Sequence, residues 1–211
     1  MACHFRLSLF AVALTLGFEA QPASSQQAPA KATAPTTASV ESGETVDGTY
    51  HNWTIGFRYK IPFGWVDRTE EMRDASTDRA KATVLLGVFE RPPETKGDTV
   101  NSAVVIAVEP ASSYPGLKNA AQYFGPVTEL TTAKGFTPVA DPYEFPVDGQ
   151  PIVRRDFIRN MGSISMHQST LALLTKGSIV SFTFLSGNDD EVTMLLEQLA
   201  FERPRKPAHK Q

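Results

Sequence analysis

The clearest hydrophobic pattern in the chain belongs to two adjacent segments near its C-terminal end. Residues Ser163–Thr175 and Ser178–Ser186 are rich in apolar side chains, and only Lys176 and Gly177 separate them. A two-residue connection with glycine is typical of a tight β-hairpin, because glycine adopts a positive φ without steric cost. The second segment is apolar on both faces: Val180, Phe182 and Phe184 on one, Ile179 and Leu185 on the other. This pattern predicts a strand inside a sheet that is covered on both sides.

A helix is predicted directly after this hairpin. Asn188 is suited to cap it, because an asparagine side chain accepts hydrogen bonds from the N–H groups of a first helical turn. Three acidic residues follow, where negative charge complements the helix dipole: Asp189, Asp190 and Glu191. Four apolar residues recur at helical spacing: Val192, Leu195, Leu196 and Leu199. We expect this apolar stripe to pack against the hairpin.

The first half of the domain is patterned as strands. Residues Tyr50–Ile55 begin one strand, and Gly56 turns the chain into a second. In the second strand apolar and basic residues alternate: Phe57, Arg58, Tyr59, Lys60 and Ile61. This alternation predicts a half-buried strand with a basic outer face. The apolar runs Val84–Phe89 and Ala103–Val108 predict interior strands, and a short helix is expected around Thr69–Arg73.

The middle of the chain predicts one helix and a second hairpin. The helix is expected to begin at a Ser113 cap and to end near Gly135. Gly125 and Pro126 are expected to break or kink it. The pair Asp148–Gly149 predicts the hairpin turn. Strands, a helix, more strands and a terminal helix do not form a regular βαβ alternation. The predicted fold class is therefore α+β, with a central mostly antiparallel sheet and helices packed on its faces.

The N-terminal part of the chain predicts an exported protein. Residues 1–25 contain a twelve-residue, mostly apolar stretch and end in small residues, as a cleaved signal peptide does. The alternative is an uncleaved segment that tethers the protein to a membrane. Residues 26–48, rich in Ala, Thr, Pro and Ser, are predicted to be a disordered spacer, 49–203 a single domain and 204–211 a basic tail. The expected location is the periplasm or the cell exterior.

Charge and cysteine content narrow the possible partners. The net charge of −3 argues against a nucleic-acid-binding domain that works by neutralising phosphates. No run of like charge suggests a membrane-surface patch, so no membrane contact is expected after signal cleavage. Cys3 is the only cysteine and lies in the predicted signal peptide, so disulfides, thiol catalysis and cysteine-bound zinc are not expected.

No sequence pattern predicts a catalytic residue, a cofactor or a metal site. The histidines outside the signal peptide, His51, His167 and His209, have no metal-binding spacing, and no G-x-S-x-G or glycine-rich phosphate loop occurs. Besides the acidic cluster at the predicted cap of the last helix, the sequence has one other cluster of acidic residues: Glu70, Glu71 and Asp74. This second cluster either forms ordinary solvated surface, or it takes part in acid–base catalysis or binds a hard cation.

Two further groups are candidates for binding. Arg154 and Arg155 are adjacent on a predicted strand and therefore point to opposite faces. One of them is expected to cover a helix edge with its aliphatic stem, and the other is a candidate for binding an anionic partner. Five aromatic residues crowd a short stretch: Trp53, Phe57, Tyr59, Phe63 and Trp65. They form either sheet core with an ordered corner or an exposed patch for a protein partner.

The motif F-x-Y-x-I-P-x-G-W at Phe57–Trp65, with the strands downstream and the acidic-capped helix, resembles the PsbP-like superfamily. That group includes the extrinsic photosystem II subunit, Ran-binding nuclear import factors and bacterial exported proteins of unknown role. The resemblance implies an α/β/α sandwich and a binding rather than catalytic role. It carries over no functional residue, because the matched positions are core and turn residues.

Two functional hypotheses follow. The first is an exported non-catalytic protein that docks on another envelope or secreted protein, whose identity the sequence does not give. The alternative is a pocket-based function, either a carrier of a small apolar ligand or a hydrolase whose site is assembled by the fold. The alternative requires a cavity of about 300–1,000 Å³. Its hydrolase form requires His167 beside a serine or carboxylate at that cavity.

Overall fold

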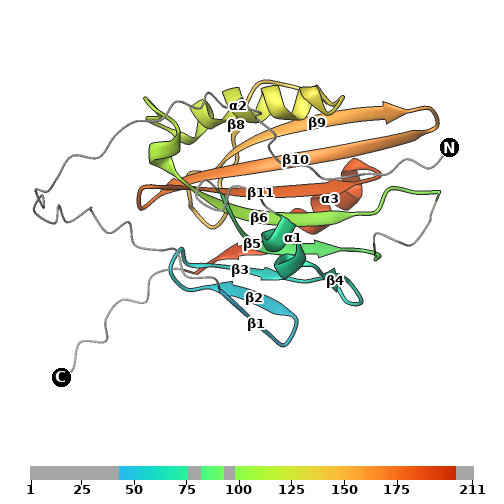
Figure 1. The fold of residues 1–211 in the computed structure, drawn as a ribbon, viewed down its shortest axis with the longest axis horizontal. Coiled ribbons are helices and arrows are strands. Elements are labelled where there is room, and N and C mark those ends of the chain that lie inside the picture. The colour runs from blue at the N-terminus through green and yellow to red at the C-terminus, as the bar shows by residue number, and fades with distance from the viewer. Residues whose placement is uncertain (1–42, 76–81, 93–97, 203–211) are drawn as a thin grey trace, which may run out of the picture.

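Two antiparallel sheets make up most of the folded chain in a computed structural model that describes residues 43–75, 82–92 and 98–202 (Figure 1). The small sheet has the order β1 (Glu44–Val46), β2 (Thr49–Asn52), β3 (Phe57–Lys60) and β12 (Leu199–Phe201). The large sheet has the order β4 (Val66–Asp67), β5 (Thr83–Phe89), β6 (Ala103–Pro110), β11 (Ser178–Ser186), β10 (Ile164–Thr175), β9 (Val153–Met161) and β7 (Thr137–Pro138), and β8 (Tyr143–Glu144) pairs with β9. The predicted α+β class is confirmed.

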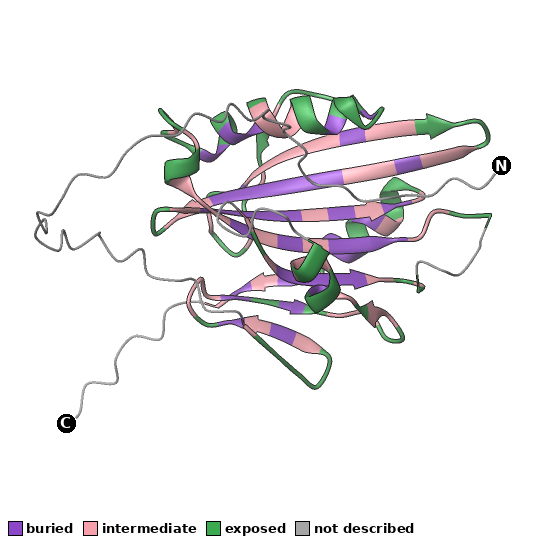
Figure 2. Cartoon of the chain, in the orientation of Figure 1, coloured by how far each residue is buried: buried purple, intermediate pink, exposed green. Residues whose placement is uncertain are grey.

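The large sheet is covered on both faces. On one face α2 (Ala120–Ala133) packs Tyr123 and Phe124 against Ile179 of β11. On the other face α3 (Asp189–Leu196) and the inner face of the small sheet share one core with Phe182 and Phe184. Figure 2 shows burial concentrated in β5, β6, β11 and the adjoining half of β10. The molecule is therefore a sandwich in which a four-stranded sheet forms part of one outer layer.

The hairpin of β10 and β11 forms as predicted. Lys176 and Gly177 have φ values of 49° and 74°, which suit the two central residues of a tight hairpin turn. β11 lies between β10 and β6, and its apolar residues face both covering layers. The predicted two-sided burial of this strand is confirmed.

The cap of α3 is also confirmed, but the helix is shorter than predicted. Asn188 Oδ1 accepts a hydrogen bond of 2.8 Å from Glu191 N. The Glu191 carboxylate accepts from Ser102 Oγ at 2.6 Å. The helix ends at Leu196, and Leu199 belongs to β12. Leu199 and Phe201 are buried at strand spacing, so their burial follows the alternation of a strand.

The middle helix begins later than predicted. Residues Ala111–Ser113 form a short 3₁₀ turn, and α2 starts at Ala120 with Asn119 as its cap. Gly116, at φ 86°, has a left-handed backbone that an α-helix from Ser113 would not accommodate. Pro126 lies inside α2 without ending it, so of the two predicted effects, a break or a kink, the break does not occur and the helix continues to Ala133.

The folded domain also begins earlier than residue 49. β1 lies within the predicted disordered spacer, 26–48, and pairs with β2. Asp47 and Gly48 have φ values of 48° and 72°, as in a tight hairpin turn. The composition of the segment did not indicate this turn. The predicted signal peptide, residues 26–42 of the spacer and the 204–211 tail lie outside the described residues.

None of the helices within residues 43–75, 82–92 and 98–202 is long and apolar enough to cross a bilayer.

Asp148 ties the second hairpin to the small sheet. It lies in the predicted turn with φ 49°, and its Oδ2 accepts a hydrogen bond of 2.8 Å from Phe201 N at the outer edge of β12. Replacement by alanine leaves this N–H without its partner and strains a positive φ, so we expect Asp148→Ala to lower the free energy of unfolding by about 1–3 kcal/mol. Asp148→Asn keeps an acceptor and tolerates that φ. Urea denaturation should therefore find the asparagine variant much closer to the unchanged protein than the alanine variant; equal losses would refute the role of the side chain.

Tyr59 carries a buried hydroxyl that has no hydrogen-bond partner among the described residues. Burial raises the pKa of this group. Because an unpaired buried hydroxyl costs free energy, we expect Tyr59→Phe to leave the stability unchanged or raise it by about 1 kcal/mol. The matched control is Tyr50, opposite Tyr59 on β2, whose hydroxyl accepts a bond of 3.0 Å from Gly43 N. Tyr50→Phe should destabilise in the same urea measurement, and the reverse ranking would contradict this assignment.

Candidate functional site

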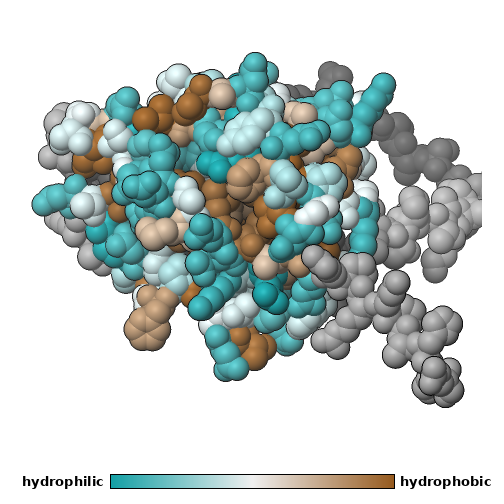
Figure 3. All heavy atoms as spheres, turned by 180° about the vertical axis from the view of Figure 1, so that it is seen from behind, coloured by the Kyte–Doolittle hydropathy of each residue, from teal (hydrophilic) through white to brown (hydrophobic). Residues whose placement is uncertain are grey.

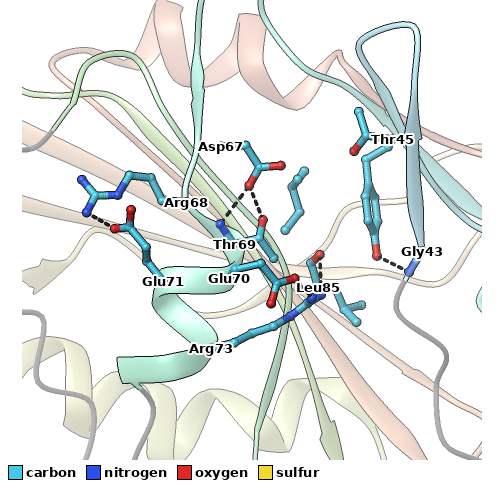
Figure 4. A pocket seen from close by; sticks show the side chains of 11 residues that line it. Gly43, Thr45, Asp67, Arg68, Thr69, Glu70, Glu71, Arg73 and Leu85 are labelled. Carbon is cyan, nitrogen blue, oxygen red and sulfur yellow. Dashed lines mark hydrogen bonds and ion pairs between the residues drawn. The ribbon is translucent and has the colours of Figure 1, made fainter.

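A crevice of about 320 Å³ lies between the small sheet and α1 (Thr69–Ala75) (Figure 4). Three groups of residues line it: Gly43, Thr45 and Tyr50 from the small-sheet side, Asp67, Arg68, Thr69, Glu70, Glu71 and Arg73 from the start of α1, and Leu85 and Leu86 from β5. The acidic residues Glu70 and Glu71 that the sequence analysis singled out therefore lie beside a cavity. Their neighbours decide what this crevice can do.

The start of α1 is fixed to β5 by short side chains. Asp67 Oδ1 accepts hydrogen bonds from the backbone N and the Oγ1 of Thr69, at 2.8 and 2.6 Å. The same Thr69 Oγ1 accepts from Gly87 N of β5 at 2.9 Å. These bonds cap the first turn of the helix, so Asp67 and Thr69 serve the fold.

Ion pairs engage the charges around the crevice. Arg73 Nε donates to Val84 O at 2.6 Å, and its Nη1 pairs with Glu70. Arg68 pairs with Glu71, and Figure 4 shows that this pair lies apart from Arg73. Within the described residues, no group of three histidine, cysteine or acidic side chains is placed to hold a metal ion. A crevice with so many charged walls does not fit the small apolar ligand of the carrier hypothesis.

His167 lies beside a carboxylate, but neither group lines the crevice. Its Nδ1 lies 2.7 Å from Asp189 Oδ1 in the first turn of α3. Ser169, two residues along the same strand, is buried and donates its hydroxyl proton to Asp156. None of these residues lines the crevice. The arrangement that the hydrolase hypothesis requires is thus not formed at this cavity.

The two adjacent arginines point to opposite faces as predicted, and both contact their own chain. Arg154 Nε donates to Asp156 Oδ1 at 2.8 Å, and its guanidinium lies 5.0 Å from the centre of the Phe145 ring. Arg155 Nη1 donates to Thr128 Oγ1 of α2 at 2.8 Å. Because both guanidinium groups are engaged in packing the sheet, the structure does not support the use of either for an anionic partner.

Asp156 also holds Tyr143 at this edge of the large sheet. The Tyr143 hydroxyl donates to Asp156 Oδ2 at 2.8 Å. Burial and the Asp156 carboxylate raise the pKa of Tyr143 to about 12. Tyr143 is therefore a neutral hydrogen-bond donor over the physiological range, in a structural role.

Of the five aromatic residues between Trp53 and Trp65, some lie in the core and others are exposed on the surface. Phe57 and Tyr59 are completely buried in the core, and Trp65 packs against it. Trp53 is 60% exposed and Phe63 is fully exposed. Phe63 lies at the tip of a turn closed by a 3.3 Å bond from Trp65 N to Pro62 O. The core interpretation holds for three residues and the exposed-surface interpretation for the other two.

Trp53 lies on the side of the small sheet that points away from the core. We call this surface the outer face; its residues are Glu44, Val46, His51, Trp53, Arg58 and Lys60. The Trp53 ring stacks on His51, with ring centres 4.8 Å apart and an interplanar angle of 13°. Its Nε1 donates a long, 3.5 Å hydrogen bond to Glu44 Oε1. These two contacts hold a large exposed aromatic ring in one orientation.

The turn that carries Trp53 is also anchored to the large sheet. Lys176 Nζ, at the tip of the β10–β11 hairpin, donates to Thr54 O at 2.5 Å. Asn52 Oδ1 accepts from Ile55 N at 2.8 Å within the turn itself. Trp53 and the basic residues of this face could be predicted from the sequence, whereas the stacking of Trp53 on His51 was not predicted. Their spacing of two residues, which puts two strand residues on one face, was the available signal.

Comparison with known proteins bears on the fold. No protein-family model and no curated protein matches this chain. Cyanobacterial PsbP (CyanoP) from Synechocystis has a similar solved structure, with 16% identity and a TM-score of 0.47 over 73% of this chain and 91% of that one. A protein of unknown function from Pseudomonas aeruginosa, PA94, is similar with 12% identity and a TM-score of 0.36, over 70% and 92% of the two chains.

LpqN from Mycobacterium tuberculosis, described as involved in cell envelope biogenesis, is similar with 13% identity and a TM-score of 0.35, over 70% of this chain and 83% of that one. A PsbP structure is thus among the matches. The TM-scores of these three likenesses are all below 0.5.

Proposed function

We propose that this protein is an exported, non-catalytic binding domain that docks on another envelope or secreted protein through the outer face of its small sheet. The observation that carries the proposal is Trp53. A 60% exposed indole, stacked on His51 and tied to Glu44, is a rigid aromatic anchor on a surface that no other described element covers. Such aromatic anchors are enriched at protein interfaces.

Other parts of the described surface also expose hydrophobic side chains, among them Phe63, Val139 and Met194, whereas the Trp53 ring is also held by contacts with His51 and Glu44. Seen from behind the view of Figure 1, hydrophilic side chains surround apolar residues that gather in the middle of this face, and further apolar residues appear at its edges (Figure 3). The charged groups of the crevice are engaged with one another and with the backbone, and His167 is engaged with Asp189. These contacts favour docking over a pocket-based function.

Two exposed valines allow a matched test of the docking surface. Val46 lies on the outer face and is 48% exposed, whereas Val139 lies just after β7 and is 64% exposed. A photo-reactive amino acid is placed at either position in the full chain, which is then irradiated in the native cell envelope. We expect position 46 to cross-link to one protein that position 139 does not capture. The same products from both positions, or none from position 46, would overturn the proposal.

A further inference from the structure

The outer face of the small sheet carries a second feature besides Trp53. Arg58 and Lys60 both point outward from β3 and are exposed. Neither side chain makes an ion pair or hydrogen bond within residues 43–75, 82–92 and 98–202. Both residues therefore present positive charge to the solvent on this face.

Two acidic side chains share this face with the two cations. Glu44, on β1, accepts the bond from Trp53 Nε1. Glu202, just after β12, lies 3.9 Å from His51 Nδ1. His51 is on β2, on the far side of β3 from β12, so the Glu202 side chain reaches across β3. Arg58 and Lys60 nevertheless have no ion pair among the described residues. A partner is therefore expected to place negative charge over β3.

The size of the face limits the shape of the partner. Four strands spaced by about 4.8 Å, each of about four residues rising about 3.3 Å, give a footprint of roughly 19 by 13 Å. That footprint is about 250 Å², well below the roughly 800 Å² per partner of a stable interface between two globular surfaces. A second copy of this chain packed face to face does not meet that requirement. An extended segment laid along β3 does fit the space.

The spacing of the cations adds a sequence requirement. Arg58 and Lys60 are two residues apart on a strand, so their side chains repeat at about 6.6 Å along the face. Alternate side chains of an extended partner segment repeat at the same distance, which matches two acidic residues at positions i and i+2. Trp53 lies beyond Arg58, at the turn between β2 and β3. An apolar residue two positions before the first acid would reach its ring.

We propose that the outer face of the small sheet binds an extended, acidic polypeptide segment of the docking partner, in which an apolar residue is followed by acidic residues at the second and fourth positions after it. This inference rests on the proposed function and adds the chemistry of the partner to it. Arg58 and Lys60 pair with the two carboxylates, and Trp53 contacts the apolar side chain.

The test uses a fluorescent peptide as the probe and the full chain as the receptor. The peptide has one phenylalanine, glutamates at the second and fourth following positions, and threonine elsewhere to favour an extended chain. A second peptide has glutamine in place of glutamate. We expect the glutamate peptide to bind at least about tenfold more tightly in fluorescence anisotropy, and its affinity to fall severalfold as sodium chloride rises from about 50 to about 300 mM.

Variants of the protein locate the binding. Trp53→Ala and the double variant Arg58→Glu with Lys60→Glu should each weaken binding of the glutamate peptide by at least about tenfold. Lys118→Glu is the matched control, because Lys118 is also exposed and its side chain makes no ion pair in the described part of the chain. It should change the affinity by less than about twofold. Unchanged thermal unfolding of the variants would show that the fold is intact.

Three outcomes overturn the inference: equal binding of both peptides, equal effects of Lys118→Glu and the double variant, or displacement of the peptide by polygalacturonate at lower concentration than by unlabelled peptide. The last outcome would assign the outer face of the small sheet to an acidic glycan.

The two experiments together also separate the proposed function from this inference. A protein cross-linked from position 46 without acidic-peptide binding leaves docking intact and refutes this inference. Peptide binding without any cross-linked protein refutes the proposed function instead.

Discussion

Replacing Phe182 with alanine should lower the free energy of unfolding by about 3–5 kcal/mol, because it opens a cavity where the two sheets meet. Phe182 lies on the central strand β11 and is completely buried. Its ring packs edge-on against Phe57 at 5.1 Å and against Phe201 at 6.0 Å between ring centres. Phe57 belongs to β3 and Phe201 to β12, so one side chain of the large sheet contacts two strands of the small one.

A matched control for Phe182→Ala is Phe63→Ala. The chemical change is identical, but Phe63 is fully exposed at the tip of its turn. Its loss should change the stability by no more than about 0.5 kcal/mol. Urea denaturation of both variants measures the difference. A loss below about 1 kcal/mol for Phe182→Ala, or similar losses for the two variants, would contradict the packing of the small sheet on the large one.

Alkaline pH should destabilise the fold steeply through buried tyrosines. Burial raises the pKa of Tyr59, and burial together with the charge and hydrogen bond of Glu109 raises that of Tyr123. An unfolded tyrosine ionises near pH 10, so above that pH the unfolded chain loses protons that the folded chain keeps. Stability is therefore full below about pH 10 and falls as the pH rises, by about 1.4 kcal/mol per pH unit for each of the two residues.

The slope can be assigned by removing the hydroxyl groups. Urea denaturation above about pH 10 should find that the double variant Tyr59→Phe with Tyr123→Phe loses roughly 3 kcal/mol per pH unit less than the unchanged protein. The comparison uses slopes, so a constant cost from losing the 2.6 Å bond between Tyr123 and Glu109 does not affect it. Titration of lysines is common to both chains and cancels. An unchanged slope would show that these tyrosines are not the source.

The parts of the fold that the sequence predicted well are those fixed by neighbours in the chain. The Lys176–Gly177 turn, the Asn188 cap and the alternation in β3 depend on residues a few positions apart. The parts that were wrong depend on distant ones. Leu199 continues the helical spacing of α3 but pairs with Tyr59 of β3, far away in the sequence. β1 is stabilised by pairing with β2, which composition alone does not reveal.

The same distinction applies to the candidate site. Local alternation predicted that Arg58 and Lys60 face outward, and the pairing of β3 with β2 and β12 agrees. Whether that face is covered depends on the packing of the whole sheet, and so does the split of the aromatic residues between core and surface. Tyr59 and Trp53 are both aromatic residues in predicted strands, and the sequence near them does not tell their positions apart. In the structure Tyr59 is buried and packs against Phe184 of the large sheet, whereas Trp53 is exposed to solvent.

Oxidative footprinting in the native cell envelope tests most directly whether the outer face of the small sheet is the docking surface. Hydroxyl radicals modify exposed tryptophan, phenylalanine and methionine side chains, and the chain offers exposed examples on and off this surface. Trp53 is 60% exposed on the outer face, and Met194 is 57% exposed on α3. We expect Trp53 to be oxidised several times more slowly in the envelope than in the purified protein, while Met194 is oxidised at the same relative rate in both. Equal oxidation of Trp53 in the two samples would contradict the account.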